Sequence, residues 1–186
     1  SNGAQNTAVG VQALELNTTG ADNVAVGQLA LSANTTAVKN TAVGKAAMEL
    51  NTTGAENTAL GYSALYANTT GANNTSVGRS ALGANTTGQD GVAIGYKALY
   101  SNLTSNSSIG IGYEALGLLT NGNNNVAIGY ASNRANLTGT DNVSVGGNSL
   151  QLNTASNNTA IGKSALTANT TGADNVAVGH LALDAN

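Results

Sequence analysis

The sequence predicts an all-β protein, a parallel β-solenoid of eleven short coils of about 17 residues each. A glycine that closes the pattern Asn-[Thr/Val]-Ala-[Val/Ile]-Gly, or a close variant of it, recurs along the whole chain at a nearly constant spacing. The residues before each glycine alternate with the period of two that a strand requires. Proline is absent, as expected where it would delete a ladder hydrogen bond in each coil that it entered.

The repeat glycines mark the coils. Their spacing is 17 residues except between Gly146 and Gly162, where it is 16, and the missing residue lies in the turn at 153–158. Residues 1–186 therefore form a single repeat domain. The repeat glycines are Gly10, Gly27, Gly44, Gly61, Gly78, Gly95, Gly112, Gly129, Gly146, Gly162 and Gly179.

Each coil is expected to contain two short strands and a turn. The first strand is predicted at positions such as 23–27, and the second at positions such as 63–67. The turn follows the second strand, as at 68–73, where Asn, Thr and Gly are typical turn formers. Stacking eleven such coils in register gives a rod about 50 Å long. We expect an interior of Ala, Val and Leu, too narrow for Phe and Trp, which the chain lacks.

The two ends of the sequence resemble the middle. Neither end carries an atypical repeat of the kind that normally shields the open ends of a solenoid, which predicts a segment of a longer fibre. Ser1-Asn2 replaces the usual Thr-Thr of the turn and is interpreted as a cloning scar.

Composition excludes several classes of function. The chain has no cysteine, one histidine and a net charge of −3, so it lacks the residues for thiolate chemistry, a His-rich metal site or a basic nucleic-acid footprint. No apolar run approaches the length of a membrane span, and no catalytic constellation is apparent. We expect a non-enzymatic protein without cofactor, metal, nucleic-acid partner or membrane insertion.

The first strand of each coil is apolar on both faces. Val24 and Val26 share one face and Ala25 occupies the other, and a strand that is apolar on both faces is usually buried on both. One face packs inside the coil, so the other is expected to meet another copy of the chain. The residues predicted to form this oligomer interface or core are Val9, Val26, Val43, Leu60, Val77, Ile94, Ile111, Ile128, Val145, Ile161 and Val178.

The recurring Asn-Val-Ala-Val-Gly and Asn-Val-Ala-Ile-Gly motifs resemble the head repeats of trimeric autotransporter adhesins, the YadA-like heads, and equally the repeat segments of bacteriophage tail fibres. The resemblance covers the whole chain, although this repeat is longer by the Asn-Thr-Thr-Gly turn. It implies a left-handed parallel β-roll, a homotrimer, and attachment to a host or cell-surface receptor or matrix. It also implies an extracellular location, on a bacterial surface or a virion.

Positions that stack in successive coils form rows, and one row is aromatic. It places Arg79 between tyrosines, in a cation–π arrangement, with two further tyrosines four residues on. This row predicts a ligand-binding patch, because exposed tyrosines favour recognition; the alternative is an aromatic ladder that stiffens the sheet edge. The candidate residues are Tyr62, Tyr66, Arg79, Tyr96, Tyr100, Tyr113 and Tyr130.

Other rows carry charges. Lys39 is expected between Asp22 and Glu56, and Lys97 beside Glu114, in exposed pairs that balance charge and contribute about 0.2–1 kcal/mol each. The lone His180 is predicted to be a solvated surface side chain.

A row of threonines runs along the turns, beginning with Thr18, Thr35 and Thr52. A regular exposed threonine array predicts an ice-binding surface. Alternatively, because these threonines lie beside a glycine turn, their hydroxyl groups are expected to hydrogen-bond the turn backbone. A structural spacer without a ligand is a third possibility for the whole rod.

Overall fold

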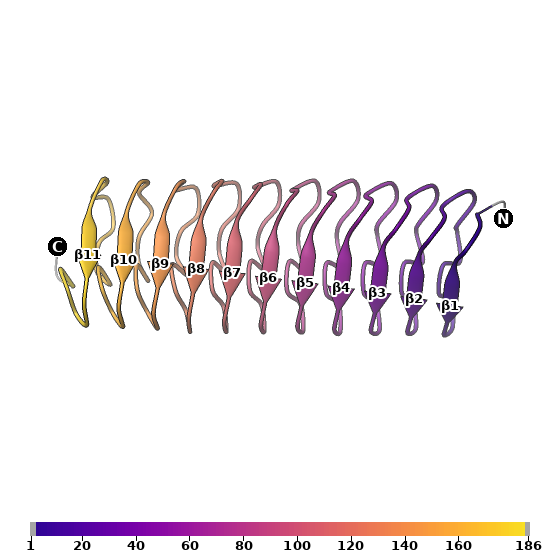
Figure 1. Ribbon diagram of the computed structural model, residues 1–186, viewed down its shortest axis with the longest axis horizontal. Helices are drawn as coiled ribbons and strands as arrows, with labels where there is room; N and C mark the ends of the chain where they lie inside the picture. Colours follow the sequence, from indigo (N-terminus) through magenta and orange to yellow (C-terminus); the bar gives the residue numbers. More distant parts are fainter. Residues whose placement is uncertain (1–2, 185–186) are drawn as a thin grey trace.

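The computed structural model describes residues 3–184 and confirms the all-β solenoid. Eleven parallel strands of three residues form one sheet in sequence order, side by side along the rod (Figure 1). No stretch of residues 3–184 forms a helix that is long and apolar enough to cross a membrane. The strands are β1 (Thr7–Val9), β2 (Val24–Val26), β3 (Thr41–Val43), β4 (Thr58–Leu60), β5 (Thr75–Val77), β6 (Val92–Ile94), β7 (Ile109–Ile111), β8 (Val126–Ile128), β9 (Val143–Val145), β10 (Thr159–Ile161) and β11 (Val176–Val178).

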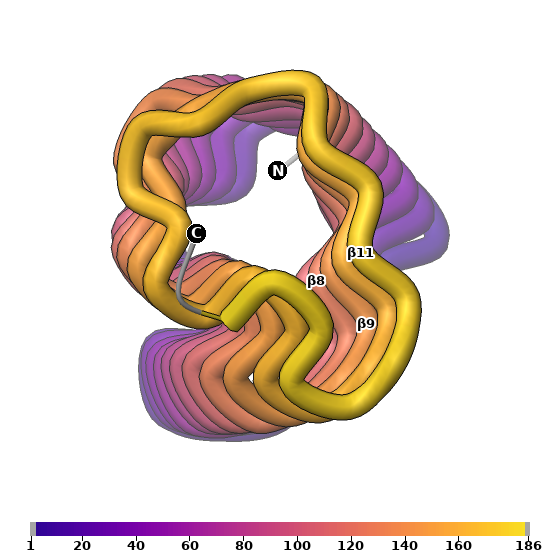
Figure 2. The backbone as a smooth tube through the Cα atoms, turned by 90° about the vertical axis from the view of Figure 1, so that its left-hand side faces the viewer, coloured from indigo at the N-terminus to yellow at the C-terminus, as the bar shows by residue number. Residues whose placement is uncertain are grey.

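The register follows the repeat. Ala25 pairs with Ala42, 17 residues on, whereas Ala160 pairs with Ser144, 16 residues back. The shortened coil is therefore absorbed in its turn without a slip of the sheet, as the sequence predicts. Seen end on, the coils superimpose as one irregular ring that rotates gradually along the axis (Figure 2). The residues interpreted as a cloning scar lie outside the described part of the chain.

The prediction of a second strand is wrong. At 63–67 the chain turns, with φ of 51° at Ser63 and 52° at Leu65, in the left-handed region that non-glycine residues adopt only at a cost. The neighbouring residues Ala64 and Leu65 both pack into the same interior cluster, whereas neighbouring side chains of a strand point to opposite faces. Hydrogen bonds to both neighbouring coils, from Ser63 to Lys45 and from Leu65 to Ala81, support this strained backbone.

Close stacking explains the repeat glycine. Gly95 has φ of 128°, where L-residues are strained, and a Cβ there would lie 2.5 Å from the carbonyl oxygen of Gly112 in the next coil. The same arrangement recurs at the other repeat glycines that are followed by a further coil. Only glycine therefore lets the chain leave the strand and pass directly against the coil above it.

The interior contains alanine and leucine but not the strand valines. The central residues of β2 to β11, such as Ala25 and Ala93, are buried, whereas Ala8 of β1 at the end of the rod is exposed. The Leu31 and Leu99 side chains pack in the same cluster as Ala25 and Ala93. At Gly110 a Cβ would already lie 3.1 Å from Leu99 Cγ. The interior thus has no room for Val at the central position, and the valines point outward, contrary to the prediction that they fill it.

Two ladders of asparagine side chains run through the interior, where the sequence indicated only turn formers. In the first, Asn23 Oδ1 accepts the Asn40 N–H (2.9 Å), and Asn40 Nδ2 donates to the Gly54 carbonyl (2.9 Å). In the second, Asn51 Nδ2 donates to Asn34 Oδ1 (3.2 Å) and to the same Gly54 carbonyl (3.0 Å). These ladders satisfy the backbone groups of the turns inside the rod.

A polar cluster interrupts the apolar core between β8 and β9. Ser132 Oγ lies 2.6 Å from Ser144 Oγ, which lies 2.6 Å from Ser149 Oγ. Beside it Asn133 occupies the position held by Leu in most other coils, and neither its side-chain oxygen nor its nitrogen has a hydrogen-bond partner among residues 3–184. The core is accordingly divided into two separate hydrophobic clusters.

Candidate functional site

The aromatic row forms a continuous stack over five consecutive coils. The Arg79 guanidinium lies 5.6 Å from the ring centroid of Tyr62 and 5.8 Å from that of Tyr96. The Tyr96 and Tyr113 rings stack at 5.2 Å, and Tyr113 and Tyr130 at 5.1 Å. The predicted placement of Arg79 between two tyrosines is confirmed, and the structure brings five of the seven candidate residues into one column.

The other two tyrosines lie in a second column, five residues after the repeat glycine. Tyr66 and Tyr100 stand in coils that are separated by the coil of Gly83, and a Cβ at Gly83 would lie 2.9 Å from the Tyr100 ring. Lys97 joins the two columns, since its Nζ lies 5.5 Å from the Tyr96 centroid and 5.1 Å from that of Tyr100.

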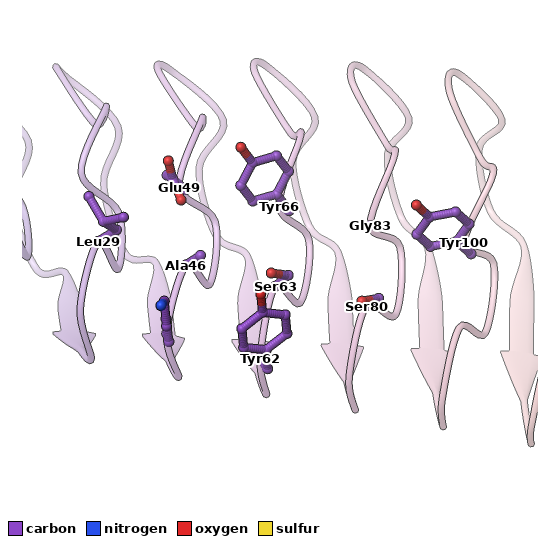
Figure 3. Close-up of a pocket in the computed structure, with 10 residues that line it drawn as sticks. Leu29, Ala46, Glu49, Tyr62, Ser63, Tyr66, Ser80, Gly83 and Tyr100 are labelled. Carbon is purple, nitrogen blue, oxygen red and sulfur yellow. The ribbon is translucent and has the colours of Figure 1, made fainter.

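An open groove of about 390 Å³ lies beside these tyrosines (Figure 3). Tyr62 and Tyr66 come from one coil, and Tyr100 approaches from two coils further along, with its ring over Gly83. A carboxylate and an ammonium complete a lining that is both aromatic and polar. The lining residues are Leu29, Lys45, Ala46, Glu49, Tyr62, Ser63, Tyr66, Ser80, Gly83 and Tyr100.

A second hollow of about 200 Å³ shares Tyr100 with the groove. Here the sequence prediction of a Lys97–Glu114 pair is wrong. Glu114 Oε2 instead accepts a hydrogen bond from Arg134 Nε at 2.6 Å, and Lys97 lies over the tyrosine rings. The Arg134 Nε–H engages the carboxylate in a charge-assisted hydrogen bond. The lining residues are Lys97, Tyr100, Ser101, Glu114, Gly117, Leu118 and Arg134.

The charge of Glu114 acts on the aromatic stack. The adjacent carboxylate, followed by partial desolvation and the neighbouring phenols of Tyr96 and Tyr130, raises the pKa of Tyr113 above its ordinary value of 10.0, against the opposing effect of Lys97. A negative phenolate beside a carboxylate is unfavourable, so Tyr113 keeps its hydroxyl proton to a higher pH than a tyrosine of ordinary pKa.

The second outward surface is an apolar stripe, defined by the third residue of each of the eleven strands, which is Val, Ile or Leu throughout. The first residue of the strand adds Val or Ile to this stripe in six strands and is threonine in the other five. Leu60 is 47% exposed and Ile94 39% exposed, and the corresponding residues of every other strand are exposed or half-buried. The eleven residues predicted for the interface or core thus lie on the outer face of the sheet, not in the core. A continuous apolar surface of this kind marks an interaction site in soluble proteins.

The threonine row follows turn chemistry. The hydroxyl groups of Thr35 and Thr52 donate to the carbonyl oxygens of Thr52 and Thr69, one coil on, at 3.1 and 2.9 Å. The predicted pair of Lys39 with Glu56 is confirmed at 3.2 Å. His180 is exposed, as predicted.

Sequence reasoning missed the residues between the tyrosines. Lys45, Glu49, Ser80 and Gly83 line the groove but carry no motif. Glu49 and Gly83 could have been found from the row five residues after the repeat glycine, in which Glu49, Tyr66, Gly83, Tyr100 and Gly117 follow one another at intervals of 17. Lys45 and Ser80 lie one and two residues after their repeat glycines, outside that row. Glycine beside tyrosine in such a row predicts a hollow beside a ring.

Comparison with protein-family models, with curated proteins and with solved structures yields no match for this chain. The candidate site therefore rests on its own geometry: an aromatic column with an adjacent groove, and an apolar stripe along the sheet.

Proposed function

We propose that this chain is a rigid, extended segment of a trimeric surface adhesin or phage tail fibre, which presents or spaces a binding surface outside the cell. The observation that carries the proposal is the apolar stripe along the outer face of all eleven strands. An exposed stripe of this length is covered most simply by other copies of the chain that lie parallel to it, since identical rods present identical stripes.

The motif resemblance described above supports three copies and a left-handed winding. The stacked coils support stiffness, because every coil is hydrogen-bonded to its neighbours through strand, turn and asparagine side chains. The aromatic column lies within coils four to eight of this rod and supports a role in attachment.

Light scattering with small-angle scattering tests the proposal. The expected result is a rod with a mass three times 18.2 kDa. A stable monomer would overturn the assembly, and a dimer would retain the stripe as interface but overturn the order of three.

Ice binding is the weaker alternative. The first threonine hydroxyl of the turns donates to a carbonyl of the next coil, so it is already engaged within the rod. Thermal hysteresis distinguishes the two functions: a depressed freezing point with no surface attachment favours ice binding, and an unchanged freezing point removes it.

A further inference from the structure

The two hollows beside Tyr100 are formed by glycine. Gly83 lines the first hollow and Gly117 the second, and both occupy the row five residues after the repeat glycine. Since neighbouring coils are about 4.7–4.9 Å apart, these glycines lie two coil steps, or about 9–10 Å, apart along the rod. The hollows are therefore consecutive depressions in one channel parallel to the axis, with the Tyr100 ring between them.

The fold does not require these residues. The same row holds Ser32, Gln151 and Thr167 in other coils, and Gln28 and Gly147 stand where Tyr62 stands in its coil. The inward rows, in contrast, are almost entirely Ala, Leu and Asn. Tyrosine and glycine gathered on one outward face of the middle coils thus serve the surface and not the stacking.

The first hollow has the chemistry of a pyranose subsite. Tyr66 is half-buried, lines the first hollow and has no aromatic stacking partner among residues 3–184, unlike Tyr113, which is stacked between Tyr96 and Tyr130. An aromatic face suits the C–H side of a sugar ring, and the nearby Ser63 and Ser80 hydroxyls suit its hydroxyl groups. One ammonium and one carboxylate, Lys45 and Glu49, cancel, which favours a neutral unit.

The second hollow carries a net positive charge. Arg134 is paired with Glu114 at 2.6 Å, which leaves the Lys97 ammonium in the lining without a carboxylate partner in the described chain. This ammonium favours an acidic unit. Tyr66 and Tyr100 belong to the fourth and sixth coils, so a sugar between them is centred one coil step before Lys97, which shares the coil of Tyr100. One coil step of about 4.7–4.9 Å suits the spacing of adjacent sugars in a linear polymer.

We propose that this channel binds a linear acidic glycan along the rod, with a neutral pyranose against Tyr66 and Tyr100 and a uronate beside Lys97. The inference rests on the proposed role in surface attachment and names the ligand class. The channel is a different surface from the apolar stripe, so an experiment can refute the glycan proposal without refuting the proposed assembly, and the reverse.

The test measures binding of the full chain by calorimetry and saturation-transfer NMR to hyaluronan and chondroitin octasaccharides, which alternate uronate with a neutral sugar. Cellohexaose and chitohexaose serve as neutral probes. We expect saturable binding of at least one octasaccharide, and at least ten-fold weaker binding of both neutral probes. Absence of binding to either octasaccharide overturns the proposal, and equal binding of a neutral probe overturns the acidic subsite.

Gly83→Gln tests the location. Gln151 occupies this row in another coil and the Gly83 φ is not in the left-handed region, so the variant is expected to fold with unchanged circular dichroism while it fills the hollow and displaces Tyr100. Binding should fall at least ten-fold, as it should in Tyr66→Ala combined with Tyr100→Ala. Thr167→Gln, in the same row but outside both hollows, is the matched control and should bind normally.

Lys97→Gln separates the subsites. It should weaken octasaccharide binding at least five-fold and leave neutral probes unaffected, and unaltered octasaccharide affinity would contradict the acidic subsite. A trimeric rod that binds no octasaccharide refutes the glycan channel alone. A monomer that binds one refutes the proposed assembly alone.

Discussion

At the scale of the residue, most positions of this chain have a single structural task that repeats in every coil. Three non-glycine residues per coil adopt left-handed φ, among them Lys97 and Leu99, and glycine closes each strand. Because the tasks repeat, the residues that depart from them are informative. Tyr113 and Asn133 are two such departures, one on the surface and one in the core.

Tyr113 is expected to ionise at a higher pH than a tyrosine of ordinary pKa. Its pKa is raised, first by Glu114, so the folded state holds the phenolic proton more tightly than the unfolded chain does. This contribution to stability is complete below the ordinary value of 10.0 and is lost as pH rises above it. A titration of phenolate absorbance should show a late component that Tyr113→Phe removes. A titration unchanged by that substitution would contradict the effect of Glu114.

Asn133 is expected to destabilise its own coil. It is buried at a leucine position, with both polar atoms of its side chain unpartnered, and a buried polar group without a partner costs about 1–3 kcal/mol. Asn133→Leu should raise the free energy of unfolding by a similar amount, measured by chemical denaturation at fixed protein concentration. Leu150→Ala, in the next coil of the same row, is the comparison and should lower it. A loss of stability in Asn133→Leu would refute the proposed cost.

At the scale of the element, the coil is held by one strand and two side-chain ladders instead of two strands. The Gly71 carbonyl accepts from Asn57 Nδ2 and from Asn68 Nδ2, both at 2.9 Å, so the two ladders meet on one row of turn carbonyls. The ladders are not perfect: Leu119 replaces asparagine in one of them and is fully buried. An apolar residue is tolerated at this position because the leucine side chain fills the space of the asparagine that it replaces.

Truncation of a ladder residue is expected to be costly. Asn57→Ala removes the acceptor of the buried Asn74 N–H (2.9 Å) and one donor to Gly71, and should lower the free energy of unfolding by about 1–3 kcal/mol. The exposed Thr53 lies in the preceding turn, and Thr53→Ala should change the free energy of unfolding by less than about 0.5 kcal/mol. Equal effects of the two substitutions in chemical denaturation would show that the ladder contributes nothing specific.

At the scale of the whole molecule, the stacked coils place different surfaces on different rows of side chains that run along the rod. Each coil contacts only the coils next to it, so the structural effect of a substitution in one outward row is not transmitted to another row. The apolar stripe runs the length of the sheet, whereas the aromatic column and its groove occupy the middle coils only. Assembly and ligand binding can therefore reside on one rod and be altered independently.

Charges on the stripe are expected to disrupt assembly and not the fold. Ile94 and Ile128 point outward and are each 39% exposed, so Ile94→Asp combined with Ile128→Asp should leave circular dichroism unchanged and reduce the mass in light scattering to that of one chain. Thr53→Asp combined with Thr70→Asp adds the same charge to the turns and should preserve the mass. Retention of the full mass by the isoleucine variant would exclude the stripe as the interface.

The sequence by itself determined the period, the parallel register and the aromatic column. A row in a stack follows from arithmetic on a 17-residue repeat, so Arg79 between Tyr62 and Tyr96 could be placed without coordinates, and so could the single shortened turn. Side-chain alternation likewise located the first strand of each coil, because it depends only on neighbouring residues, although the second strand predicted at 63–67 is absent from the described structure.

Only the tertiary structure decided what lies inside. Alternation separates Val24 and Val26 from Ala25 but does not say which face is inward, because all three are apolar. The closeness of Leu99 to the central strand position at Gly110 shows that this inward face has room only for small residues. Likewise the inward asparagines, the left-handed residues at 63–65 and the hollow at Gly83 depend on how a 17-residue ring closes upon itself. Closure of the ring depends on contacts between residues far apart in the coil, so the local sequence pattern does not predict it.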